Sequence, residues 1–324
     1  MDMSCSRQHV DRRRALTAAG GLVTGAFLAL AGPSHNAASA PARRPALAAA
    51  GQYANPVIWQ DFADIDAIRV GDTYYASAST MHYSPGAPVL RSYDLVNWEI
   101  AGHSVPVPSP AVPTPPRQVT PMTGVDTFDG TTLKPRWEWN HNPDNTKWSA
   151  GNGLTLRTAT VTNDLYWARN TLTHRVQGPT STATVQIDHT AMRDGNRAGL
   201  ALLRDSSAWI GVRREGGTTR VAMVSGLTMD GSWNTTGTGT ELASAALSSG
   251  RIWLRATADI RPGAARPGTF SYSTDGTNFT RLGPALTMGN DWRFFMGYRF
   301  ALFDHATQTL GGAVRVLRFE LSTP

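Results

Sequence analysis

Apolar and polar residues alternate in short runs through most of the chain after residue 126, and these runs end at Gly, Asp, Asn or Pro. The clearest run places Ala183, Val185 and Ile187 on one face and Thr184 and Gln186 on the other. A period of two residues is typical of a strand with one buried face. The pattern therefore predicts strands from residue 126 to the end of the chain.

Two further runs and one turn support this prediction. Residues 252–260 and 317–321 alternate in the same way, and the second run assigns Leu317 to the apolar face. Asp275 and Gly276 predict a tight hairpin turn, because both residue types accept a positive φ. No helical period follows the N-terminal segment. We predict an all-β fold in which this region forms a two-sheet sandwich, with a barrel as the alternative.

A shorter β unit precedes the sandwich, over residues 53–105. Gly71 and Asp72 form its predicted turn between two apolar strands. Residues 106–125 then separate the unit from the sandwich at 126–324, and the stretch 105–123 contains seven prolines. Proline cannot donate a hydrogen bond to a sheet, so we expect an extended connector here.

The N-terminus is typical of an export signal. Arg12 and Arg13 precede an apolar run at residues 15–31, and small residues follow it. Paired arginines before such a run favour bacterial twin-arginine export, so we expect residues 1–50 to be signal and leader and the protein to be secreted. Cleavage after Ala40 and cleavage after Ala50 both fit the small residues.

Charge and cysteine content narrow the possible partners. The first 40 residues carry four arginines and two aspartates, so their removal lowers the net charge from +6 to +4. The remaining basic residues form no run, which argues against nucleic acid as a partner. The single cysteine, Cys5, would leave with the signal, and the histidines lack metal-ligand spacing. We expect no cofactor, no metal and no membrane attachment after signal removal; the oligomeric state stays open.

Two sets of residues resemble one family. Residues 55–98, NPVIWQDFADIDAIRVGDTYYASASTMHYSPGAPVLRSYDLVNW, resemble the first four-stranded blade of the glycoside hydrolase family 43 propeller, found in β-xylosidases and α-arabinofuranosidases. The later sequences WEWNHNPD, ARNTLT, DGNRAGL and FMGYRFALF resemble the concanavalin A-like sandwich that accompanies many of these β-xylosidases. The resemblance implies a truncated β-propeller fragment of one blade, followed by that sandwich.

The resemblance also implies an inverting glycosidase in which Asp64 is the general base. Asp66 is the nearby rival, and a strand-entry cap is the structural alternative for Asp64. The family's general acid is a Glu from a later blade. None of the five glutamates of this chain, Glu99, Glu138, Glu215, Glu241 and Glu320, matches its context. A general acid was therefore not found, and we expect activity near background.

Most of the propeller is missing as well. Five blades of roughly 40–50 residues need about 200–250 residues, whereas residues 53–105 provide one blade. A lone blade cannot bury both of its faces, so we expect this segment to be poorly ordered unless it docks on the sandwich or on another chain.

Four residues are candidates for saccharide contacts. The resemblance places His82 and Tyr83 in a substrate-lining loop, with an ordinary surface loop as the alternative. Trp137 and Trp139 could stack on sugar rings, or they could belong to the core between the sheets. We expect plant cell-wall polysaccharide of the xylan or arabinan type as the partner. The alternatives to an enzyme are a non-catalytic carbohydrate-binding protein and a decayed gene fragment.

Overall fold

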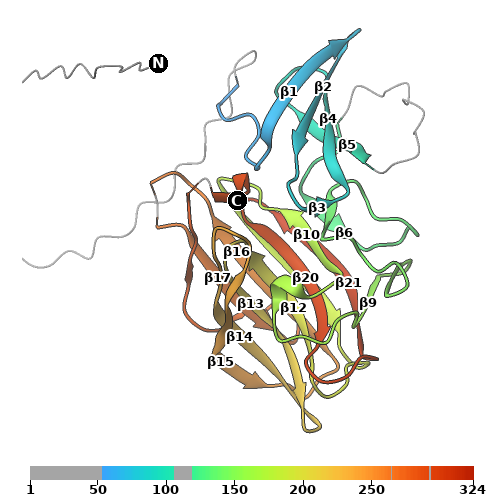
Figure 1. Ribbon diagram of the computed structural model, residues 1–324, viewed down its shortest axis with the longest axis vertical. Coiled ribbons are helices and arrows are strands. Elements are labelled where there is room, and N and C mark those ends of the chain that lie inside the picture. The colour runs from blue at the N-terminus through green and yellow to red at the C-terminus, as the bar shows by residue number, and fades with distance from the viewer. Residues whose placement is uncertain (1–52, 106–118, 264, 292) are drawn as a thin grey trace, which may run out of the picture. The chain divides into compact units, whose positions relative to one another are not determined.

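The computed structural model describes residues 53–105, 119–263, 265–291 and 293–324. The predicted signal and leader, and most of the proline-rich connector, lie outside these residues. The described chain is built of strands in three antiparallel sheets, with two single-turn 3-10 helices, η1 (Leu165–Trp167) and η2 (Arg293–Phe295) (Figure 1). The prediction of an all-β fold is confirmed.

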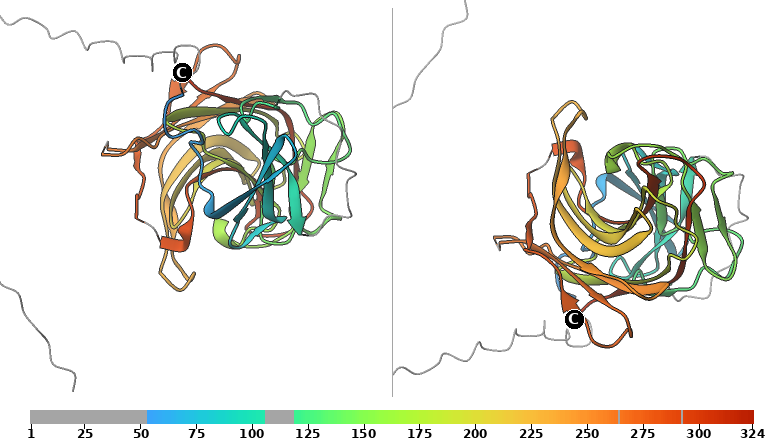
Figure 2. Two further views of the ribbon diagram at one scale, coloured as in Figure 1. Left: turned by 90° about the horizontal axis from the view of Figure 1, so that it is seen from above. Right: turned by 90° about the horizontal axis from the view of Figure 1, so that it is seen from below.

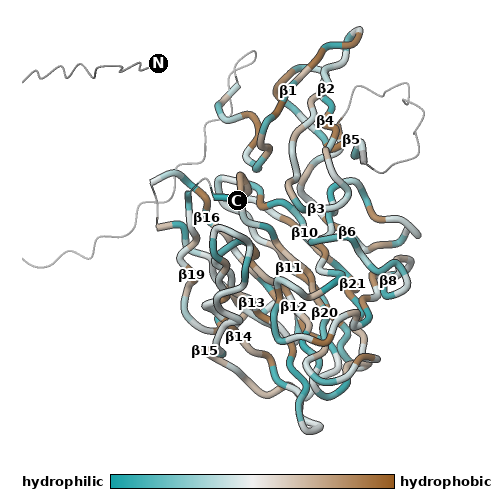
Figure 3. Tube along the Cα trace, viewed as in Figure 1, coloured by the Kyte–Doolittle hydropathy of each residue, from teal (hydrophilic) through white to brown (hydrophobic). Residues whose placement is uncertain are grey.

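The N-terminal sheet has four strands in the order β1-β2-β4-β5. They are β1 (Ala63–Val70), β2 (Thr73–Ser79), β4 (Gly86–Ser92) and β5 (Trp98–Val105). Gly71 has a φ of 61° in the turn between β1 and β2, as the sequence predicts. Strand β1 lies at the edge of the sheet, where Ile65, Ile68 and Val70 are 47%, 62% and 57% exposed. Figure 3 shows hydrophobic residues along β1.

An eight-stranded sheet forms one layer of the sandwich, in the order β15-β14-β13-β12-β20-β10-β7-β3. In chain order, its strands are β3 (Tyr83–Ser84), β7 (Trp137–Asn140), β10 (Thr171–Arg175), β12 (Asn196–Leu203), β13 (Ser206–Glu215), β14 (Thr218–Met229), β15 (Thr235–Ala246) and β20 (Arg299–Ala306). Strand β3 comes from the N-terminal segment and pairs with β7 through Tyr83–Asn140 and Ser84–Trp139. The N-terminal segment therefore supplies the edge strand of this layer.

A nine-stranded sheet forms the other layer, with β18-β17-β16-β11-β21-β9-β8 in sequence, β19 beside β17 and β6 beside β21. Its strands are β6 (Gly124–Asp126), β8 (Trp148–Ala150), β9 (Leu154–Arg157), β11 (Thr180–Asp188), β16 (Arg251–Asp259), β17 (Pro267–Ser273), β18 (Thr280–Arg281), β19 (Leu286–Thr287) and β21 (Ala313–Ser322). Figure 2 shows how the two layers lie against each other.

The main core lies between these two layers. Ala183, Val185 and Ile187 are fully buried there, together with the apolar face of residues 252–258. The predicted alternation is confirmed over residues 183–187 and 252–258, whereas at the end of the second run Asp259 is buried and Ile260 is only half-buried. A second apolar cluster packs on the opposite face of the eight-stranded sheet, where Leu165 and Tyr166 of η1 cover side chains such as Trp209 and Phe303.

Two local predictions are wrong. Leu317 is only half-buried, because it lies at a β-bulge where the pairing changes from Gln186–Arg318 to Ile187–Val316. The turn at Asp275 is wider than a two-residue hairpin, since Tyr272 pairs with Thr280 and only Gly276 of the predicted pair has a positive φ.

No helix of the described residues is both long enough and apolar enough to span a membrane.

Candidate functional site

A buried cluster of opposite charges joins the N-terminal segment to the sandwich. Glu138 and Arg175 are each 1% exposed, and Arg175 Nη2 donates to Glu138 Oε1 at 2.9 Å. Arg299, also 1% exposed, lies 3.7 Å from the other carboxylate oxygen. Asp61 pairs with both arginines and accepts a hydrogen bond of 2.9 Å from the backbone N–H of Gly297. Two carboxylates thus balance two guanidinium groups at the junction.

Neighbouring rings complete this cluster. The guanidinium group of Arg175 lies 4.2 Å from the centre of the Phe62 ring, and that of Arg299 lies 4.8 Å from the Tyr83 ring. His103 Nε2 lies 3.4 Å from Glu138 Oε1. Burial alone would raise the pKa of Glu138, but the hydrogen bond to His103 and the charges of Arg175 and Arg299 lower it to about 2. Glu138 is therefore ionised at neutral pH.

These contacts dock residues 53–105 on the sandwich. Asp61, Phe62, Tyr83 and His103 all belong to the N-terminal segment, and the backbone N–H of Gly178 adds a hydrogen bond of 2.8 Å to the carbonyl of Trp59. Docking on the sandwich is one of the two conditions under which we expect this segment to be ordered. Strand β1, which begins two residues after Asp61, is an edge strand of the same sheet and is largely exposed.

A line of aromatic and imidazole rings runs beside the junction. Trp167 stacks with His141 at 6.2 Å, His141 lies 5.2 Å from His82, His82 lies 4.8 Å from Trp233, and Trp233 lies 4.0 Å from Phe294. We call these five residues the aromatic row. Trp167 is 64% exposed and Trp233 is 39% exposed, so two indole faces are open to solvent.

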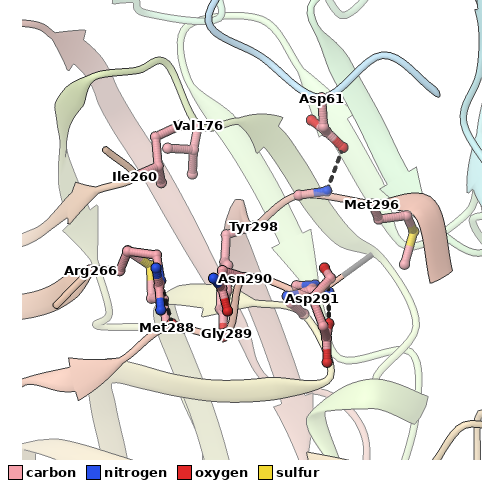
Figure 4. A pocket seen from close by; sticks show the side chains of 12 residues that line it. Asp61, Val176, Ile260, Arg266, Met288, Gly289, Asn290, Asp291, Met296 and Tyr298 are labelled. Carbon is pink, nitrogen blue, oxygen red and sulfur yellow. Dashed lines mark hydrogen bonds and ion pairs between the residues drawn. The ribbon is translucent and has the colours of Figure 1, made fainter. Parts of the chain in front are cut away.

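A hollow of about 540 Å³ adjoins one end of the aromatic row. Its lining residues are Met81, Gly231, Trp233, Asp291, Arg293, Phe294 and Phe295. A smaller cavity of about 220 Å³ lies beside Asp61, with Tyr298, Asn290 and Asp291 among its polar lining residues (Figure 4). Both spaces combine apolar walls with a few polar groups, which is the usual character of small-ligand sites.

The structure brings some of the predicted site residues together and separates others. His82 lies in the aromatic row, where its Nε2–H donates a hydrogen bond of 2.7 Å to Asn140 Oδ1, and burial lowers its pKa to about 4. Tyr83 lies beneath it and is 3% exposed, so it supports the row rather than facing solvent.

Trp137 and Trp139 lie in the core between the sheets, at 2% and 5% exposure. Trp137 Nε1 donates to the carboxylate of Asp126 at 2.9 Å, which satisfies its buried N–H group. Neither indole has an open face on which a sugar ring could stack. The core interpretation fits both residues.

Asp64 is exposed and lies inside β1, not before it, with a φ of 54° at an irregularity in the β1–β2 pairing. The preceding residue, Ala63, pairs with Ser79. Asp64 therefore lies at the end of the sheet where β2 finishes at Ser79 and the chain runs on to His82. Among the described residues, no group of three or more His, Cys, Asp and Glu could hold a metal ion.

Sequence reasoning missed the charged cluster and the far half of the aromatic row. Glu138 stands between Trp137 and Trp139 in a predicted strand, and an acid so placed requires a cation when it is buried. That signal could have pointed to a buried ion pair. Nothing in the sequence links Glu138 to its partners Arg175, Arg299 and Asp61. Likewise, nothing in the sequence links His82 to Trp233 or Phe294.

The two facing sheets, with a curved eight-stranded layer and a core between them, define a concanavalin A-like sandwich. Residues 125–321 match the β-xylosidase C-terminal concanavalin A-like domain, and residues 53–112 match the glycosyl hydrolases of family 43. The chain belongs to this family of β-xylosidase C-terminal domains, with a family 43 segment before it. The expected resemblance to family 43 and to its concanavalin A-like domain is confirmed.

Curated relatives match a short stretch of the chain. A β-xylosidase of Formosa agariphila is 51% identical over 53 residues, which are 16% of this chain and 9% of that protein. A non-reducing end α-L-arabinofuranosidase of Bacteroides ovatus is 43% identical over 56 residues, 17% of this chain and 11% of that protein. The chain thus spans about a tenth of the length of these relatives.

Solved structures match the whole fold. A family 43 glycoside hydrolase, engineered to display endo-xylanase and exo-arabinofuranosidase activity, has a TM-score of 0.79 and 25% identity, covering 84% of this chain and 99% of that chain. A bifunctional family 43 protein of Bacteroides eggerthii has a TM-score of 0.72 and 20% identity, covering 83% and 63% of the two chains.

Proposed function

We propose that this chain is a secreted family 43-type protein of plant polysaccharide metabolism that binds saccharides of the xylan or arabinan type. The β-xylosidase and α-L-arabinofuranosidase relatives support the saccharide class. Arg12 and Arg13 before an apolar run support export by the twin-arginine route. The aromatic row supports binding, because exposed aromatic faces suit the apolar faces of sugar rings.

The state of the glutamates carries the second half of the proposal, that the chain alone does not hydrolyse glycosidic bonds. A general acid needs a raised pKa in order to hold its proton near neutral pH. Every glutamate of the chain instead forms an ion pair with arginine: Glu99 with Arg91, Glu138 with Arg175, Glu215 and Glu241 with Arg213, and Glu320 with Arg318. None of them has the surroundings of a catalytic acid.

Asp64 alone cannot replace a complete catalytic pair. In an inverting glycosidase, one carboxylate activates water while a carboxylic acid protonates the leaving oxygen. Each kind of assistance contributes roughly 10²–10⁴-fold to the rate. Asp304 does have a raised pKa, but it is 1% exposed and cannot reach a saccharide. Saccharide binding without turnover is the function that these residues support best.

The first test is hydrolysis of aryl β-xyloside and aryl α-arabinofuranoside by the purified chain. We expect the wild-type protein and Asp64→Ala to release the aryl group at the same background rate, because no acid accompanies the base. Turnover that disappears in Asp64→Ala would overturn the proposal. A rate that then rises with the square of protein concentration would place the acid on a second copy.

Replacement of Trp233 tests the binding half of the proposal. Loss of one stacked ring contributes about 0.5–1.5 kcal/mol, so Trp233→Ala should weaken binding of xylo-oligosaccharides by roughly two- to tenfold. Calorimetric titration measures this change. The matched control is Trp253→Ala, because Trp253 lies on the outer face of the nine-stranded sheet, opposite Gln186. Equal affinities of both variants and the wild type for xylo-oligosaccharides would exclude the aromatic row as their binding site.

A further inference from the structure

Four basic residues form a line across the face of the eight-stranded sheet that points away from the main core. His305 of β20 pairs directly with Arg197 of β12, Arg197 pairs with Arg213 of β13, and Arg213 pairs with Arg220 of β14. We call these four residues the basic row. These residues lie on the same face of the sheet as the second apolar cluster. The basic row and the aromatic row have no residue in common.

Two glutamates only partly neutralise the basic row. Glu215 lies 2.6 Å from Arg213, 3.8 Å from Arg197 and 3.7 Å from Arg220. Glu241 pairs with Arg213 and lies 3.3 Å from Arg220. Like charges directly opposite one another in a sheet repel, so three aligned arginines need counter-charge. Two carboxylates facing three guanidinium groups leave one positive charge in excess.

Three residues of the basic row hold hydrogen-bonding atoms without partners in the protein. His305 is 1% exposed, and neither of its ring nitrogens forms a hydrogen bond. The Nε atoms of Arg197 and Arg213 are likewise buried without an acceptor. Buried polar groups are nearly always hydrogen-bonded, so this concentration of unpaired donors on one face points to a ligand that brings acceptor oxygens. Burial and the charge of Arg197 lower the pKa of His305 to about 3, so its ring is neutral.

The row can be reached from solvent. The side chains of Arg197 and Arg220 are 22% and 40% exposed, and that of Glu215 is 43% exposed. The short turn between β13 and β14, at Gly216 and Gly217, lies at this end of the sheet. Figure 2 shows that the strands of this layer are curved. The row is therefore open to solvent at Arg197 and Arg220.

We propose that the basic row binds the carboxylate of an acidic sugar residue, a uronic acid carried by the polysaccharide. The planar guanidinium group of Arg197 matches a carboxylate in two parallel hydrogen bonds, and His305 supplies a further N–H. One excess charge suits a single carboxylate and not the repeated phosphates of a nucleic acid. This inference rests on the proposed function, since it adds a charged decoration to the same class of partner.

The test titrates the full chain with D-glucuronate, with D-glucose as the neutral counterpart, and follows binding by NMR. We expect glucuronate to bind and glucose not to bind. Arg197→Gln and Arg220→Gln should each weaken glucuronate binding, Arg197→Gln by about ten- to a hundredfold, the range expected for lost charged hydrogen bonds. Arg251→Gln is the matched control, because Arg251 is 64% exposed on the nine-stranded sheet.

Each remaining outcome has a definite meaning. If glucose binds as tightly as glucuronate, the carboxylate is not recognised and the proposal is overturned. If inorganic sulfate binds as tightly as glucuronate, the row holds an adventitious ion only, which also overturns the proposal. Absence of glucuronate binding would overturn it whether or not neutral xylo-oligosaccharides bind. If Arg197→Gln fails to fold, Arg197→Lys keeps the charge but not the paired geometry and should lose most of the affinity. Failure of Trp233→Ala to affect xylo-oligosaccharides would instead count against the aromatic row.

Discussion

Replacing Glu138 by Gln should lower the free energy of unfolding by about 3–5 kcal/mol. The side chain is 1% exposed and balances Arg175 and Arg299, which are equally buried. Glutamine keeps the size of the side chain but removes its charge, so Asp61 alone would face two guanidinium groups in a dry environment. Removing one partner of a buried ion pair is far more costly than removing one partner at the surface.

The loss should also depend on pH. The pKa of Glu138 falls from an ordinary 4.5 to about 2 on folding, so its contribution is complete above about pH 4.5 and disappears as the pH falls toward 2. Urea denaturation of wild type and Glu138→Gln at several pH values measures the difference. Glu320→Gln is the matched control, since its side chain is 40% exposed beside Arg318. A loss below 1 kcal/mol at pH 7 would contradict a buried, charge-balancing role.

The charged cluster explains how the N-terminal four-stranded sheet is held on the sandwich. Much of β1 is exposed, so the sheet gains little from its own packing on that side. The residues just before β1 and just after β2 include Asp61 and Tyr83, which contact the sandwich, and Tyr83 belongs to an edge strand of the eight-stranded layer. Because the junction is held by charges that are costly to separate, the Glu138→Gln loss should include detachment of residues 53–105, visible as faster proteolysis within them.

The sequence predicts the fold class because alternation along a strand is a local property. Residues 183–187 and 252–258 are read correctly, since each strand buries one face between the two layers. Leu317 is assigned to the wrong face, because a β-bulge changes the phase of the strand and depends on the pairing with β11. The width of the turn at Asp275 likewise depends on the pairing of β17 with β18.

The candidate site is harder to predict, since its parts meet only in the folded chain. Asp61 and Arg299 are 238 residues apart in the sequence, yet they form one ion pair. Glu138 breaks the alternation rule, because Trp137, Glu138 and Trp139 are all buried. Both faces of β7 are covered there: one by the main core, the other by groups from the N-terminal segment, including His103. A single strand's pattern cannot show that a distant segment covers its second face.

Replacing Asp304 by Asn should raise the free energy of unfolding at pH 7 by about 1–3 kcal/mol. Asp304 shares its face of β20 with Phe300 and Leu302 and so points into the main core, where it is 1% exposed. Neither carboxyl oxygen has a well-formed hydrogen bond. Burial raises the pKa of Asp304 well above its ordinary value, and the backbone of Val314 offsets this only in part. Folding above the ordinary pKa therefore costs either the burial of a charged carboxylate or the uptake of a proton, and asparagine avoids both.

The pH dependence separates this cause from a packing effect. Between the ordinary pKa of 3.8 and the raised value, the folded state binds the proton that the unfolded state has released, so wild-type stability falls as the pH rises. The advantage of Asp304→Asn should thus be large at pH 7 and vanish near pH ~3, where both states of the wild type are protonated. Chemical denaturation across this range measures it, with the exposed Asp66→Asn as control. A constant difference at all pH values would mean that packing, not the proton, sets the stability at this position.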